Sequence, residues 1–310
     1  MQFLITAIVA VNLLVGVAAL CPSVCSCITS SNGVHVDCSS RGLSSIPRHL
    51  PTNTVVLLLH DNKITSIESD TFNNFRNLIR LDLDNNEISV IEDNNFNNLP
   101  NLKYLYLHTN RITSIKSDMF NKLSKLVDLF LNQNRITSIK SDMFNNLMNL
   151  RKLFLHQNRI TSIKSDTFKN LNLYVLYLHE NRITSIKSDA FNNLRNLKQL
   201  WLMSNPISVV EENAFNMLPN LEELKFHMYC ASCDNIPFWR WLRRQSTFTT
   251  YIYCNDFHGK KLSNLFLTNF NDDCTANDGN GSVWCSRHGD WTCLIYMFFM
   301  ISLQYIMSNI

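Results

Sequence analysis

The sequence predicts an α/β solenoid, in which short coils share one parallel β-sheet and a disulfide-bonded module closes each end. Three observations predict this fold class. The segment NRITSIKSD recurs unchanged at 110–118, 134–142, 158–166 and 181–189. Asparagines recur every 24 residues, with one interval of 23, through the middle of the 310-residue chain. The ten cysteines lie toward the two ends, with none between Cys38 and Cys230, which is typical of stacked repeats between stapled modules.

Each repeat follows the pattern L-x-x-L-x-L-x-x-N, as in Leu102, Leu105, Leu107 and Asn110. Alternation with a period of two places the leucines inside a strand, and the buried Asn amide needs backbone partners. A Phe follows each Asn and is expected to pack under its neighbour. The pattern is identified as the leucine-rich repeat, which implies a horseshoe with a concave sheet over residues 52–229. The repeated asparagines are Asn62, Asn86, Asn110, Asn134, Asn158, Asn181 and Asn205; the phenylalanines are Phe72, Phe96, Phe120, Phe144, Phe168, Phe191 and Phe215.

NRITSIKSD is expected to form the turn and flank of one coil. In its first copy Ile112 and Ile115 face the core, whereas Thr113, Ser114 and Lys116 face solvent. Two interpretations of the resulting lysine row stand: a basic stripe for a polyanion such as a glycosaminoglycan, or a solvated flank. The second is favoured, because aspartates two residues further on are expected to neutralise the lysines. The rows are Lys116, Lys140, Lys164 and Lys187, and Asp118, Asp142, Asp166 and Asp189.

Residues 1–20 form an apolar run that ends in small residues, which is typical of a secretory signal peptide. An N-terminal membrane anchor is the alternative. The segment 21–51 begins C-P-x-x-C-x-C and resembles the N-terminal cap of extracellular leucine-rich repeat proteins. The spacing alone leaves three connectivities open. The resemblance implies the pairs Cys21–Cys27 and Cys25–Cys38.

The segment 230–274 resembles the C-terminal cap of the same proteins, and the resemblance implies Cys230–Cys254 and Cys233–Cys274. The first two of these cysteines are spaced C-x-x-C, where that cap usually has C-x-C. Four cysteines in this arrangement are also compatible with a zinc site, but a secreted chain favours disulfides.

The last segment, 275–310, combines small residues at 280–282, a polar spacer and an apolar end. This order predicts a glycosylphosphatidylinositol (GPI) anchor signal with attachment near Asn280, which is also a glycosylation sequon. A marginal transmembrane helix and an artefact of the gene model are the alternatives. The chain is therefore expected at the cell surface or secreted.

The predicted binding surface is the sheet, because the outward strand positions differ between repeats whose other segments are nearly identical. Aromatic side chains recur at the fifth position of the pattern and are typical of binding hot spots, although an aromatic ladder that only stabilises the sheet is the alternative. The candidate ligand-binding residues are Tyr106, Phe130, Phe154, Tyr177, Trp201, His108, His156, His179, Arg80, Asp82, Asp84, Arg151 and Lys152.

His156 and His179 occupy equivalent positions in adjacent repeats, next to Glu180. Such a group can hold a metal, but polar or pH-sensitive contact residues are the favoured interpretation. No metal or other cofactor is therefore predicted.

The chain contains no common catalytic or nucleotide-binding motif, and its net charge of +3 does not indicate nucleic acid as a partner. The mature chain resembles the variable lymphocyte receptors of jawless vertebrates and their single-gene relatives in invertebrate chordates. That resemblance implies a non-enzymatic receptor for microbial protein or carbohydrate ligands. Adhesion or neuronal signalling through a host protein is the alternative, and a glycosaminoglycan-binding matrix scaffold is a third.

Overall fold

A computed structural model describes residues 21–228, Asn235, Phe238, Leu242, 249–254 and 260–261. The predicted signal peptide, the C-terminal cysteine pairs and the tail with Asn280 lie outside these described residues. The chain divides into two compact units. Unit 1 is formed by residues up to Arg135 together with Asn146–Leu150, and unit 2 by Ile136–Asn145 together with residues from Arg151 onward.

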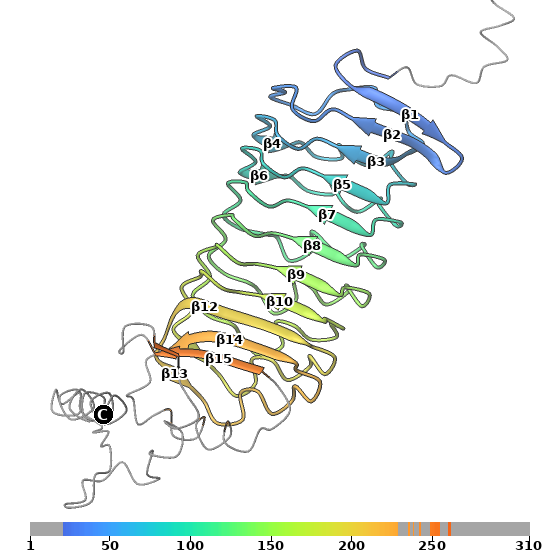
Figure 1. Cartoon of the computed structure of the whole chain (residues 1–310). Coiled ribbons are helices and arrows are strands. Elements are labelled where there is room, and N and C mark those ends of the chain that lie inside the picture. The colour runs from blue at the N-terminus through green and yellow to red at the C-terminus, as the bar shows by residue number, and fades with distance from the viewer. Residues whose placement is uncertain are drawn as a thin grey trace, which may run out of the picture. The chain divides into compact units, whose positions relative to one another are not determined.

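Unit 1 contains six strands of one sheet in the order β1-β2-β3-β5-β7-β8. The first two form an antiparallel hairpin, and the others are parallel coil strands (Figure 1). Their bounds are β1 Ser26–Ser30, β2 Gly33–Asp37, β3 Thr54–Leu58, β5 Arg80–Asp82, β7 Tyr104–Tyr106 and β8 Asp128–Phe130. A second, two-stranded sheet of β4 (Ser66–Ile67) and β6 (Val90–Ile91) forms where each coil returns.

Unit 2 continues the same design with strands in the order β9-β10-β12-β14-β15-β16. All neighbours pair in parallel except β15 and β16, which are antiparallel. The bounds are β9 Lys152–Phe154, β10 Val175–Tyr177, β12 Gln199–Ile207, β14 Glu223–Met228, β15 Thr249–Cys254 and β16 Lys260–Lys261. Strands β11 (Ser185–Ile186) and β13 (Val209–Val210) form the returning two-stranded sheet of this unit.

The strand register places equivalent positions of successive repeats side by side. In unit 1, Leu81 pairs with Leu105 and both are fully buried. In unit 2, Leu176 pairs with Leu200, and both are again fully buried. The predicted parallel solenoid is confirmed, because every coil supplies its leucines to a shared core that one repeat alone cannot form.

The repeated asparagines join each coil to the one before it. Asn86 donates through Nδ2 to the carbonyl of Leu59 at 2.9 Å, and its Oδ1 accepts the Ile64 N–H at 3.1 Å. Both partners belong to the preceding coil. The same two bonds recur at Asn110 and Asn205. The predicted inward orientation of these amides is therefore confirmed, since a buried backbone group without a partner is costly.

The repeated phenylalanines form columns on the returning side of the coils. In unit 1, the ring centroids of Phe72 and Phe96 lie 6.1 Å apart with nearly parallel planes. In unit 2, Phe168 and Phe191 lie 6.2 Å apart and are also nearly parallel. All four rings are buried. The expectation that each Phe packs against its neighbour is thus confirmed within each unit.

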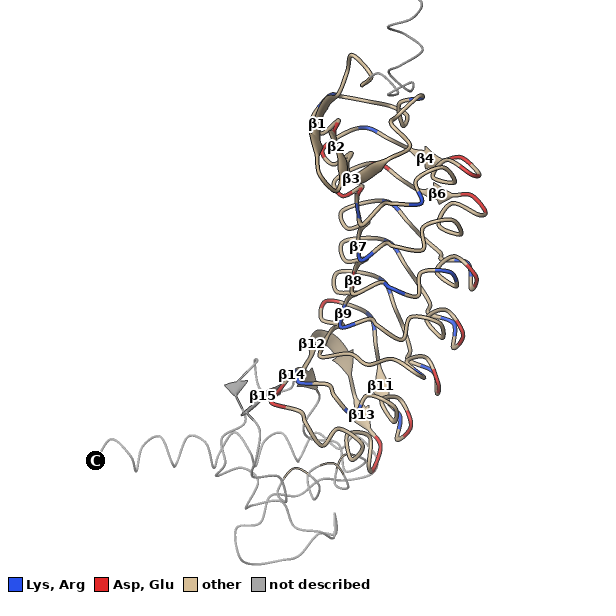
Figure 2. Cartoon of the chain, turned by 90° about the vertical axis from the view of Figure 1, so that its right-hand side faces the viewer, with Lys and Arg blue, Asp and Glu red and all other residues tan. Residues whose placement is uncertain are grey.

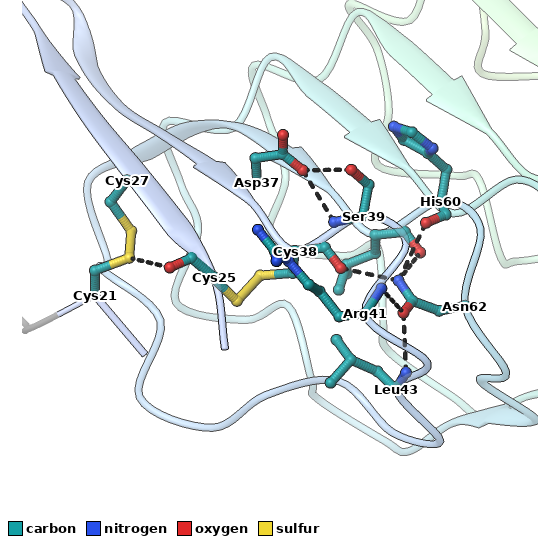
Figure 3. Close-up of a disulfide and its surroundings, with 11 residues drawn as sticks. Cys21, Cys25, Cys27, Asp37, Cys38, Ser39, Arg41, Leu43, His60 and Asn62 are labelled. Carbon is teal, nitrogen blue, oxygen red and sulfur yellow. Dashed lines mark hydrogen bonds between the residues drawn. A yellow bond between two sulfur atoms is a disulfide. The ribbon is translucent and has the colours of Figure 1, made fainter. Parts of the chain in front are cut away.

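Two disulfides, Cys21–Cys27 and Cys25–Cys38, tie the N-terminal hairpin together (Figure 3). This is the pairing that the resemblance implied. Asn62 of the first coil donates to the carbonyl of Cys38 at 2.9 Å, and it accepts the Leu43 N–H at 2.9 Å. Asn62 therefore joins the cap to the first repeat through the same pair of side-chain to backbone hydrogen bonds that joins one coil to the next. Within the described part of the chain, no helix is long and apolar enough to cross a membrane.

Candidate functional site on the parallel sheet

All predicted ligand-binding side chains except Arg151 and Lys152 fall into two clusters, one in each unit. We call them the Tyr106 cluster and the Trp201 cluster. The Tyr106 cluster comprises Arg80, Asp82, Asp84, Tyr106, His108 and Phe130. The Trp201 cluster comprises Phe154, His156, Tyr177, His179, Gln199, Trp201, Glu223 and Lys225. The aromatic side chains of both clusters are half-buried rather than fully exposed.

In the Tyr106 cluster the Tyr106 ring is covered on both faces. Phe130 of β8 stacks on it with centroids 4.5 Å apart and an angle of 11° between the planes. The Arg80 guanidinium of β5 lies 4.7 Å from the ring centroid. Because β5 and β8 flank β7 on opposite sides, the two neighbours cover opposite faces. Tyr106 therefore presents an edge and its hydroxyl end, and not an open face, to a ligand.

Two carboxylates with different environments lie beside this stack. Asp82 is 3% exposed and accepts a 2.8 Å hydrogen bond from Arg80 Nη2. Burial opposes ionisation of Asp82, but hydrogen bonds from Asp84 and Arg80 outweigh it and lower the pKa of Asp82. Burial, a hydrogen bond to Asp82 and the Asp82 charge raise the pKa of Asp84 to about 7. The pair thus holds one proton near neutral pH.

Two details of this cluster differ from a simple outward-facing strand position. Asp82 is almost inaccessible, because Arg80 from the same strand folds over it and forms the ion pair. His108 approaches Asp84, with Nε2 3.4 Å from Oδ2, and burial lowers the pKa of His108. Asp82 therefore positions Arg80 and does not itself offer a surface to a ligand.

In the Trp201 cluster the central ring is again covered on both faces. Tyr177 of β10 stacks on Trp201 at 4.0 Å with an angle of 7°. The Lys225 ammonium of β14 lies 4.2 Å from the Trp201 ring centroid. Phe154 adds an edge contact to Tyr177 at 5.2 Å. Since β10 and β14 flank β12, Tyr177 and Lys225 cover opposite faces of the Trp201 ring. The aromatic rings therefore stand on edge along the sheet, and the Lys225 ammonium is the last group of the row.

The polar ends of these rings are held by hydrogen bonds within the cluster. The Tyr177 hydroxyl donates to Gln199 Oε1 at 2.9 Å. Trp201 Nε1 donates to Glu223 Oε2 at 2.9 Å, and the other Glu223 oxygen lies 2.8 Å from Lys225 Nζ. Such bonds fix the side-chain rotamers before a ligand arrives, which reduces the entropy cost of binding.

His156 and His179 lie together, as the sequence predicted, but as stacked rings. Their centroids are 4.3 Å apart and their planes differ by 12°. Glu180 accepts a 2.9 Å hydrogen bond from Gln157. Burial lowers the pKa of His179. Among the described residues, no group of three His, Cys, Asp or Glu side chains is arranged to hold a metal ion.

Lys152 is the first residue of β9, and Arg151 immediately precedes that strand. Arg151 Nη1 donates to the carbonyl of Asn172 at 3.1 Å, and its guanidinium lies 5.5 Å from the Tyr174 ring centroid. Lys152 is exposed.

Sequence reasoning left three participants of the Trp201 cluster out of the site: Gln199, Glu223 and Lys225. Their signal was present, because Lys225 occupies the position of Trp201 one repeat later, and the other two lie two residues before those positions on the same face.

Repeated coils that expose a rigid, aromatic-rich strand surface define a repeat-built binding scaffold. The description "BspA type Leucine rich repeat region" matches this chain in six copies, over residues 56–174, 133–242 and 161–271. These matches together cover more than half of the chain. The chain therefore belongs to the leucine-rich repeat proteins of this family. Proteins of this class generally mediate protein recognition and are typically non-enzymatic scaffolds.

Curated relatives match only short parts of the chain. It is 44% identical over 64 residues to Leucine-rich repeat-containing protein 3 of Rattus norvegicus, covering 21% of this chain and 25% of the relative. It is 46% identical over 61 residues to Leucine-rich repeat-containing protein 3B of Homo sapiens, covering 20% and 23%. It is 47% identical over 58 residues to Leucine-rich repeat-containing protein 4 of Rattus norvegicus, covering 19% and 9%. The chain thus spans a quarter or less of the length of these relatives.

Proposed function

We propose that this chain is a non-enzymatic recognition receptor that binds a protein ligand on the outward face of its parallel sheets, with microbial surface proteins as the leading class. The observation that carries the proposal is the Trp201 cluster. The edges of its aromatic rings are exposed, hydrogen bonds hold Tyr177 and Trp201 in place, and the Lys225 ammonium covers the outer face of Trp201. Aromatic residues held in this way are typical of hot spots in protein interfaces.

The ring geometry favours protein over carbohydrate within this proposal. A sugar that binds an aromatic residue lays its apolar face against the open face of the ring. Both faces of Trp201 are already covered, by Tyr177 and Lys225. Edges and side-chain tips instead suit the uneven apolar surface of a protein, where shape complementarity selects the partner.

The location that we propose is extracellular, either secreted or held at the cell surface by a GPI anchor near Asn280. The N-terminal disulfides support an oxidising compartment, since small disulfide-stapled modules are typical of secreted proteins. A receptor of the variable-lymphocyte type fits this location and the varied strand surface. A host-protein partner in adhesion or signalling is the competing function, and the experiment below separates the two.

The test uses the tagged full chain as a staining reagent for a panel of bacteria, fungi and host cells, measured by flow cytometry. We expect staining of one or more microbial surfaces, and the double variant Tyr177→Ala with Trp201→Ala should reduce the affinity that produces it about thirtyfold, which corresponds to a hot-spot loss of about 2 kcal/mol. The matched control changes Val90→Ala and Met217→Ala, two exposed apolar side chains outside the large sheet that carries the Trp201 cluster: Val90 lies in β6 of the returning two-stranded sheet, and Met217 lies in no strand. It should stain like the original chain.

Treating the target cells separates the ligand classes. Protease treatment should remove staining, and periodate oxidation of surface sugars should not. Staining that survives the Tyr177/Trp201 change would exclude the Trp201 cluster as the binding surface. Staining confined to host cells would favour adhesion. Sequencing the gene from several individuals adds an independent check, because immune recognition predicts polymorphism concentrated at the outward strand positions.

A further inference from the structure

The flank formed by NRITSIKSD carries two parallel rows of cations in unit 2. In each copy the isoleucines are buried, whereas the Arg and Lys side chains are exposed. Because the segments stack in register, equivalent cations of successive coils lie next to one another. The unit 2 cation flank, as we call it, comprises Arg159 and Arg182 in one row, and Lys140, Lys164 and Lys187 in the other.

The same flank is neutralised in unit 1 by acids from the preceding repeat. Arg111 Nη1 lies 3.0 Å from Glu87 Oε2, a residue 24 positions earlier. Lys116 forms an ion pair with Asp93, 23 positions earlier. Lys116 thus takes its acid from the coil before, and not from Asp118 of its own turn. Where a carboxylate is offered on this flank, the cation binds it.

In unit 2 these carboxylates are replaced. Glu87 lies one repeat before Arg111 in the sequence. The equivalent residue one repeat before Arg182 is another cation, Arg159. The positions that correspond to Asp93 are Ser141 for Lys164 and Ser165 for Lys187. Within the described residues, Arg159, Arg182, Lys164 and Lys187 form no ion pair. The four cations of these two coils are therefore available to an external anion.

An aspartate follows each lysine by two residues, but in the part of the chain that the structure describes these aspartates do not form ion pairs with Lys164 and Lys187. Asp166 sits at a turn, with φ of 60° and its carbonyl bound by the Lys169 N–H at 3.1 Å. Figure 2 shows basic and acidic segments alternating along these turns in the β11 region. The flank has five cations against Asp142, Asp166 and Asp189. Glu211 of the next coil lies beside Lys187, where it accepts the Ser188 N–H at 3.0 Å, so the excess of positive charge lies at Lys140, Arg159, Lys164 and Arg182. Between the two rows lie the exposed hydroxyls of Thr161, Ser162 and Thr184.

We propose that the unit 2 cation flank binds a linear sulfated polysaccharide that runs across the coils. A flexible chain of regularly spaced sulfates can meet one cation of each row at every coil, while the hydroxyls donate to sulfate oxygens. Duplex nucleic acid needs more charge than this flank offers, and single-stranded nucleic acid needs exposed rings for base stacking. The NRITSIKSD segments have none. This surface is separate from the Trp201 cluster, so the two proposals stand or fall independently.

The test measures retention of the full chain on immobilised heparin as NaCl is raised. One triple variant removes three unpaired cations, Arg159→Gln, Arg182→Gln and Lys164→Gln. Its matched control removes three paired cations, Arg111→Gln, Lys116→Gln and Lys198→Gln; Lys198 is bound to Glu222 at 2.6 Å. Both triples carry the same net charge. Because the changed side chains are all exposed, melting curves should match the original chain.

We expect the first triple to elute at clearly lower NaCl, with the slope of log affinity against log salt reduced by about one for each cation removed. The control triple should elute close to the original chain. Equal shifts in both triples would show a response to net charge only and would overturn the proposal. So would no retention of the original chain at physiological salt, or equal retention on desulfated heparin. Stronger binding to anionic phosphatidylserine vesicles than to heparin would assign the flank to membranes instead. Tyr177→Ala with Trp201→Ala must leave heparin retention unchanged.

Discussion

At the scale of single residues, Asp84 is the group whose protonation controls the charge of the Tyr106 cluster. Its carboxyl is half-buried and hydrogen-bonded to Asp82, and burial with the Asp82 charge raises its pKa to about 7. In an unfolded chain the same group titrates near 3.8. The folded protein therefore binds more protons than the unfolded chain between these values, so this residue makes stability fall as pH rises.

We predict that Asp84→Asn stabilises the protein at high pH only. The contribution of protonated Asp84 to the free energy of unfolding is fully present below about pH 4 and is lost as pH rises through about 7. The asparagine amide is a neutral hydrogen-bond donor at every pH, so the variant does not lose this contribution. The gain at pH 8 should be about 1 to 3 kcal/mol, since one pKa unit is about 1.4 kcal/mol and Asp82 shares the titration. Urea unfolding at pH 4.5 and pH 8 measures it. The exposed Asp118→Asn is the control, and a gain that does not grow with pH would contradict the assignment.

At the scale of elements, the junction between coils depends on a few buried amides. Asn181 donates to the carbonyl of Leu155 at 3.0 Å and accepts the Ile160 N–H at 3.0 Å. Both partners belong to the preceding coil, and Asn181 is 6% exposed. No water can replace these bonds without opening the stack. One side chain thus links the strand of a coil to both ends of its neighbour's turn.

We predict that Asn181→Ala destabilises unit 2 by about 3 kcal/mol or more, because several buried backbone groups lose their partner and each costs about 1 to 3 kcal/mol. Asn181→Asp keeps the shape and the acceptor but loses the donor, so it should be nearly as harmful. Asn192→Ala changes an exposed asparagine in the same repeat and should shift stability by less than about 0.5 kcal/mol. Chemical denaturation reports all three. Similar losses for Asn181 and Asn192 would refute the role of the buried amide.

The sequence predicted the elements far better than the contacts on their surface. A period of two decides which side a residue takes, so Leu200 and Asn205 could be placed in the core and Trp201 on the outer face. The period does not choose a rotamer. It could not show that Asp82 lies beneath Arg80, or that Trp201 lies between Tyr177 and Lys225. Such contacts depend on which side chains meet across a register, and this becomes visible only when coils are aligned in space.

At the scale of the whole molecule, the repeated segment makes the chain divisible at defined points. In a solenoid each coil contacts only its neighbours, so stability is close to a sum of coil and interface contributions. Residues 110–118 and 134–142 have the same sequence. Deleting 111–134 therefore joins Asn110 to Arg135 and leaves NRITSIKSD intact across the new junction. One full repeat is removed without creating any new local sequence.

We predict that the chain lacking 111–134 folds cooperatively, forms both N-terminal disulfides and keeps the heparin retention and the Trp201-dependent staining of the full chain. Its melting temperature should fall modestly, because one coil and one interface are lost. The matched control deletes 111–122, which is half a repeat. It places Leu123 after Asn110 and breaks the inward-outward alternation, so it should aggregate or fail to melt cooperatively. Thermal circular dichroism and limited proteolysis compare the two. If both deletions failed to fold, the coils would be coupled beyond their neighbours; if both folded alike, the period of 24 residues would not be what specifies the stack.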